Sequence, residues 1–81
     1  MTLLDIIQRE LNNRKPSERG RLCNIYVGDK EFLEIITNHD FHKYAHVLPN
    51  GDITLFSPHV FLIRVMSDSY LDINFSRDLQ R

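Results

Sequence analysis

The segment that most constrains the fold is Tyr44–Phe56, which reads YAHVLPNGDITLF and predicts a β-hairpin. Its centre, Asn50-Gly51, accepts the positive φ angles of a type I′ turn, and the twist of that turn matches the two strands that it joins. On both sides of the turn, apolar and polar residues alternate with the two-residue period of a strand. The hairpin predicts an antiparallel sheet, and it is a signal about folding rather than about function.

Length and charge limit the classes of protein to consider. The 81 residues are the size of one domain, and the net charge of −1 gives no general attraction to nucleic acid or to an acidic membrane. Cys23 is the one cysteine, so no internal disulfide is possible, which favours a reducing compartment and predicts a cytoplasmic protein. Every apolar run is shorter than the ~18 residues of a membrane span, so we expect no membrane association.

Residues 2–15 predict an amphipathic helix. Thr2 is a suitable N-cap, and Asp5 stands where the acid of a capping box belongs. Pro16 ends the helix because the residue before a proline is pushed out of helical geometry, and residues 16–21 then form a linker. The apolar stripe of this helix consists of Leu3, Leu4, Ile7 and Leu11.

Residues 22–75 predict a sheet, followed by a loose tail over residues 76–81. Lys30–Asn38 fits both a short helix and a strand, and its β-branched residues and its shortness favour the strand. In Tyr70–Phe75, apolar and polar residues alternate regularly. Because each connection is short enough for a hairpin, we expect an α+β fold whose N-terminal helix packs on an antiparallel β-meander of five to six short strands.

The predicted strand Val60–Met66 is apolar on both faces. One face carries Phe61, Ile63 and Val65, and the other carries Val60, Leu62 and Met66. A strand of this kind is normally covered on both sides, and the single clear helix covers one of them. Either the sheet curls over itself or a second subunit covers the other face. Tyrosines suit an interface because they give a large contact area. The expected interface residues are Val60, Leu62, Met66, Tyr26 and Tyr70.

Histidines and an aspartate form a cluster in the middle of the sequence, at His39, Asp40, His42 and His46. Imidazole and carboxylate groups are ordinary ligands of zinc or iron, so a metal-binding or hydrolytic site is one alternative function. In a strand, His42 and His46 share a face but lie too far apart to chelate one ion unaided. No HExxH motif or cysteine pair supports such a site, so we expect no metal ligand, catalytic residue or cofactor.

Basic residues are concentrated near the N-terminus, at Arg14, Lys15, Arg19 and Arg21. This segment could contact an acidic protein or a phosphate backbone, which makes nucleic-acid binding a second alternative. It lacks the interleaved aromatic residues of a single-strand binder.

The sequence therefore favours a small non-catalytic protein-interaction module, of the adaptor or inhibitor type. We expect it to form a homodimer through a face or an edge of its sheet, on the argument that one helix leaves one face uncovered.

Overall fold

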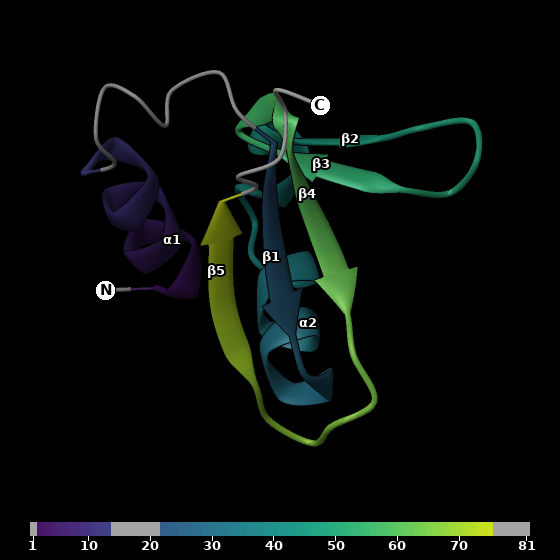
Figure 1. The fold of residues 1–81 in the computed structure, drawn as a ribbon. Helices are drawn as coiled ribbons and strands as arrows, with labels where there is room; N and C mark the ends of the chain where they lie inside the picture. The colour runs from purple at the N-terminus through teal and green to yellow at the C-terminus, as the bar shows by residue number, and fades with distance from the viewer. Residues whose placement is uncertain (1, 14–21, 76–81) are drawn as a thin grey trace, which may run out of the picture.

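The computed structural model describes residues 2–13 and 22–75 and has three helices and five strands. Figure 1 shows their arrangement, in which α2 lies behind the strands and β2 and β3 project from the body. In chain order the elements are α1 (Leu3–Asn12), β1 (Cys23–Val27), α2 (Asp29–Ile36), α3 (Phe41–Tyr44), β2 (Ala45–Val47), β3 (Ile53–Leu55), β4 (Ser57–Arg64) and β5 (Leu71–Phe75). The predicted α+β class and the number of strands are confirmed.

The strands form one sheet in the order β2-β3-β4-β1-β5. The central pair, β1 and β4, is parallel, and the other three pairs are antiparallel. The prediction of a purely antiparallel meander is therefore wrong. A parallel pair needs a crossover connection rather than a hairpin. Here α2, α3 and the β2–β3 hairpin together make that connection from β1 to β4.

The sequence favoured a strand over Lys30–Asn38, and the structure has helix α2 there instead. The first turn of this helix carries the carboxylates of Asp29 and Glu31, which suit the positive end of a helix dipole. Its buried contact with the sheet is made by Ile35, which has no exposed surface. Tertiary packing and the charges of the first turn thus outweigh the strand preference of the β-branched residues.

Helix α1 confirms the predicted cap and apolar stripe. The Thr2 backbone N–H donates to the Asp5 carboxylate at 3.1 Å, and the Asp5 backbone N–H donates to the Thr2 hydroxyl at 3.3 Å, which completes a capping box. The stripe residues Leu3, Leu4, Ile7 and Leu11 are all buried. The helix ends at Asn12, with Asn13 as its C-cap. The predicted helix end at Lys15, the linker 16–21 and the tail 76–81 lie outside the described residues.

The β2–β3 hairpin forms as predicted, with a different turn. The Gly51 N–H donates to the Leu48 carbonyl at 2.9 Å, and the Leu48 N–H donates to the Asp52 carbonyl at 2.7 Å. Gly51 has a φ of 95°, whereas Asn50 does not have the positive φ that a type I′ turn requires. The loop is therefore a turn from Leu48 to Gly51 whose last residue is a left-handed glycine, the usual form of a slightly longer hairpin loop.

Alternation along β1 separates two faces of the sheet. At most 1% of the surface of Cys23, Ile25 and Val27 is exposed, whereas Asn24 and Tyr26 between them are partly exposed. The buried set belongs to one core with the stripe of α1, with Ile35 of α2 and with Val60 and Leu62 of β4. The two long helices therefore cover one face of the sheet, and no helix of residues 2–13 and 22–75 covers the other.

Candidate interaction surface

The sheet has an open face, which is the face opposite α1 and α2. It is formed by alternate residues of three adjacent strands: Asn24 and Tyr26 of β1, Phe61 and Ile63 of β4, and Asp72 and Asn74 of β5. Tyr26 lies directly between Ile63 and Asp72 in the register of the sheet. The open face is therefore apolar along β4 and polar along β5, with a tyrosine where the two meet.

The five residues expected at an interface fall into separate places. Val60 and Leu62 are 2% and 6% exposed and lie in the core under the helices, so the monomer offers little of their surface to a partner. Met66 is fully exposed in the loop that follows β4. Tyr26 and Tyr70 are both accessible and line one depression. The accessible apolar side of β4 is the one that carries Phe61 and Ile63.

The depression on the open face has a volume of about 440 Å³. Its lining residues come from β1, from β5 and from the loop between β4 and β5. They are Tyr26, Val65, Ser67, Tyr70, Asp72 and Asn74. The sequence had singled out the two tyrosines, but it could not identify the residues beside them. The pairing of β5 with β1, which places Asp72 opposite Tyr26, is not encoded by either strand alone.

The loop that forms one rim of this depression is fastened to the N-terminal end of α2. The Gly28 N–H donates to the Tyr70 carbonyl at 2.9 Å, the Asp29 N–H to the Ser67 carbonyl at 2.8 Å, and the Lys30 N–H to the Asp68 carbonyl at 2.9 Å. The first N–H groups of a helix have no partner within the helix, and here the loop supplies three carbonyls for them. The position of the loop is thereby tied to that of α2.

The Glu31 side chain also attaches the loop to α2. Its carboxylate accepts a hydrogen bond from the Ser69 hydroxyl and another from the Tyr70 backbone N–H at 2.9 Å. These two hydrogen bonds, the one from Ser69 first, hold the pKa of the Glu31 carboxyl below its usual value of 4.5. Tyr70 is therefore held through both its N–H and its carbonyl, and its side chain projects from a fixed piece of backbone.

Gly28 allows the loop to lie this close to α2. A Cβ atom at this position would lie 2.7 Å from the Tyr70 nitrogen and 2.8 Å from the Ser67 oxygen. Both are backbone atoms, so a side chain could be accommodated only if the loop moved. A glycine is needed here for close approach rather than for an unusual φ, since its φ of −81° is ordinary.

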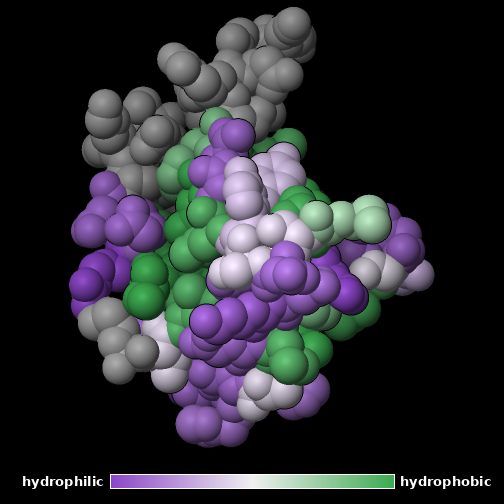
Figure 2. Space-filling model, turned by 90° about the horizontal axis from the view of Figure 1, so that it is seen from below, coloured by the Kyte–Doolittle hydropathy of each residue, from purple (hydrophilic) through white to green (hydrophobic). Residues whose placement is uncertain are grey.

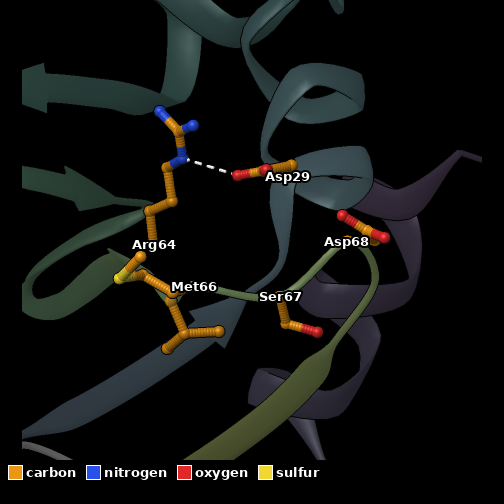
Figure 3. A pocket seen from close by; sticks show the side chains of 6 residues that line it. Asp29, Arg64, Met66, Ser67 and Asp68 are labelled. Atoms are coloured by element: carbon orange, nitrogen blue, oxygen red, sulfur yellow. Dashed lines mark hydrogen bonds and ion pairs between the residues drawn. The ribbon is translucent and has the colours of Figure 1, made fainter.

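On the helix side of the same loop lies a second pocket of about 460 Å³, shown in Figure 3. The Arg64 Nε donates to the Asp29 carboxylate at 2.8 Å, and the Arg64 guanidinium lies 5.5 Å from the centre of the Phe32 ring. The rest of the pocket is lined by Val65, Met66, Ser67 and Asp68. Because Arg64 already contacts a carboxylate and a ring of α2, this pocket belongs to the attachment between β4 and α2.

Figure 2 views the molecule from the end that carries the β4–β5 loop. Polar groups form a band across the middle of this view, and hydrophobic surface lies on both sides of the band. The chain therefore presents mixed apolar and polar chemistry at this end, as protein-binding surfaces commonly do.

The histidine cluster of the sequence does not assemble into one site. His39 and Asp40 are neighbours with 3.5 Å between the imidazole Nε2 and the carboxylate, and the side chain of His39 is 92% exposed. His42 packs on the Phe41 ring with 5.7 Å between ring centres, and His46 lies on β2 opposite Thr54. In residues 2–13 and 22–75, no three His, Cys, Asp or Glu side chains are grouped so that they could hold a metal ion.

The other residues that the sequence singled out lie in different parts of the chain. Cys23 is buried. The basic residues Arg14, Lys15, Arg19 and Arg21 lie outside the described residues. Within the part of the chain that the structure describes, no helix has the length and apolar character needed to cross a membrane. Comparisons with protein-family models, with curated proteins and with solved structures found no match.

Proposed function

We propose that this chain is a non-catalytic protein-interaction module, of the adaptor or inhibitor type, that binds another protein with the open face of its sheet. The observation that carries the proposal is the apolar side of β4 on a face that no helix covers in the part of the chain that the structure describes. Phe61 and Ile63 are partly exposed there, beside Tyr26. A sheet with one solvated face normally carries polar residues on that face.

The chemistry of the open face supports binding. Its aromatic and aliphatic residues provide apolar area, and Tyr26 and Tyr70 add phenol groups at the border with the polar side. Tyrosines at the centre of an interface commonly contribute a large share of its binding free energy. Asp72, Asn74 and Ser67 are groups that can orient a partner through hydrogen bonds.

The proposal is tested by replacing Phe61 with a photo-cross-linking amino acid in the cells that make this protein. We expect ultraviolet light to link the protein to a discrete partner from this position. The control is the same substitution at Leu33, which is 59% exposed on α2, on the helix side of the molecule. Links that form equally from both positions, or from Leu33 alone, would contradict a role for the open face.

Self-association is part of the same proposal, because a second copy could cover the open face. An 81-residue chain gains more from such an association than a large domain would, since its own core is small. We expect sedimentation equilibrium to give a homodimer whose population rises with concentration, and Ile63→Lys to shift it toward the monomer. A wild-type protein that stays monomeric at high concentration would remove the homodimer from the proposal.

A further inference from the structure

We propose that the depression on the open face binds a cationic side chain, lysine or arginine, of the partner protein. This inference rests on the proposed function, because it names the chemistry that the open face recognises. The depression is the one lined by Tyr26, Tyr70 and Asp72, together with Val65, Ser67 and Asn74.

Charge is the first argument. Asp72 is the one acidic residue among the six lining residues, and none of them is a lysine, an arginine or a histidine. The nearby Arg64 is on the helix side, where it contacts the Asp29 carboxylate and the Phe32 ring. A positive group that enters the depression therefore meets a negative one, and an acidic side chain would be repelled.

The tyrosine rings are the second argument. The face of an aromatic ring is negative, so it attracts a cation within about 6 Å of its centre. Two such rings, Tyr26 and Tyr70, border the same depression as the carboxylate. Both Lys and Arg also have long apolar stems, which can lie against Val65 while the charged end reaches Asp72.

The end of the Tyr26 side chain and the backbone of Tyr70 are held before a partner arrives. The Asn24 side-chain amide donates to the Tyr26 hydroxyl at 3.2 Å, which fixes the end of that side chain. The backbone of Tyr70 is fixed by Gly28 and by the Glu31 carboxylate. Binding at this depression thus costs less ordering of side chains than binding at a mobile loop would.

The experiment uses the full chain, labelled with nitrogen-15, and titrates it with an acetylated peptide in which glycine alternates with arginine. We expect saturable shifts of the backbone amide signals of Tyr26, Tyr70 and Asp72. Matched peptides with glutamine or glutamate in place of arginine should leave these signals unchanged. Equal shifts with the glutamine peptide, or arginine-induced shifts confined to other parts of the chain, would overturn the inference.

Substitutions test the contributions of the Asp72 carboxylate and the Tyr70 ring to this interaction. Asp72→Asn and Tyr70→Leu should each lower the affinity for the arginine peptide by about two- to fivefold. This is the range measured for exposed ion pairs and cation–π contacts. Glu34→Gln removes the same charge as Asp72→Asn from the exposed surface of α2 and should leave the affinity unchanged. If all three variants bind the peptide as the wild type does, or if Glu34→Gln weakens it equally, the depression is not the site.

The two proposals fail in different ways. Cross-links from position 61 together with no response to the arginine peptide would keep the interaction module and remove the cationic side chain. A response to the peptide without position-specific cross-links would keep a basic-residue site and remove the open face as the surface for the cellular partner. A duplex RNA that shifts the same signals more strongly than the peptide would also overturn the inference, because it would assign the depression to another class of partner.

Discussion

Along β4, the two faces of the sheet differ in burial and not in apolar character. Along β4, Val60 and Leu62 point toward the helices and are nearly inaccessible, whereas Phe61 and Ile63 between them are partly exposed. All four are apolar. The difference comes from what lies opposite each face. The apolar residues of α1 and α2 share one core with the helix face. In Figure 1, α2 lies behind the strands, and no helix of the described residues lies in front of them.

This difference separates two uses of apolar residues. Those on the helix face hold the monomer together, because they leave water when the chain folds. Those on the open face remain partly in water in the monomer and would gain the same free energy when a partner covers them. Substitutions on the two faces should therefore change different measurements: stability for the helix face, and association for the open face.

The largest expected effect is a loss of stability that differs between two isoleucines, one on each face of the sheet. Ile25→Ala removes a side chain that has no exposed surface and should lower the free energy of unfolding by about 2–5 kcal/mol. Ile63→Ala, the same change on the open face, should cost about 1 kcal/mol or less, because that site is already partly hydrated. Urea denaturation of both variants measures the difference. Equal losses of stability would mean that the open face is as much a part of the core as the helix face.

The attachment of the β4–β5 loop to α2 provides the next effect. Gly28→Ala places a methyl group within 2.8 Å of backbone atoms of Ser67 and Tyr70. We expect a loss of about 1–3 kcal/mol in unfolding free energy, since the loop must shift to make room. Spectral changes at Tyr70 and Asp72 should accompany it, because the rim of the depression moves with the loop. An unchanged stability would show that the loop is not tied to the helix.

A smaller effect is expected at Gly51, the glycine that the turn between β2 and β3 requires. Gly51 has a φ of 95° and open space around its Cα. Gly51→Ala therefore introduces backbone strain without a steric clash and should cost about 1 kcal/mol. The depression should be unaffected, because the hairpin tip is not part of it. Thermal unfolding and the Tyr70 amide signal test the two halves of this expectation.

The smallest effect concerns pH. The folded-state pKa of Glu31 lies below 4.5, so its hydrogen bonds to Ser69 and Tyr70 stabilise the fold above about pH 4.5 and are lost as the pH falls through the folded pKa. Glu31→Gln should be less stable than the wild type at pH 7. The difference should shrink toward pH 3, which urea midpoints at the two pH values can measure. A difference that grows on acidification would contradict this role.

The sequence predicted the elements whose signals are local. The capping box of Thr2 and Asp5, the stripe of α1 and the hairpin at Gly51 each depend on residues close together in the chain, and each is present.

The helix α2 and the partners of β1 could not be predicted in the same way. The N-terminal turn of α2 is satisfied by carbonyls of Ser67, Asp68 and Tyr70, nearly forty residues further along the chain, as the sequence separation of the Glu31–Tyr70 bond shows. The parallel pairing of β1 with β4 likewise depends on long-range packing. For this reason the sequence identified apolar residues on β4 and two tyrosines, but it did not establish which side of β4 the helices would cover.

The most direct measurement of the difference between the two faces is thiol labelling at adjacent residues of β4. Wild-type Cys23 is buried and provides a slow baseline. In dilute native protein, Ile63→Cys should react with a maleimide much faster than this baseline and become protected when the partner binds, whereas Leu62→Cys should react only when the chain unfolds. If the two variants react at the same slow rate in the dilute isolated protein, the open face is already covered, and the account given for it is wrong.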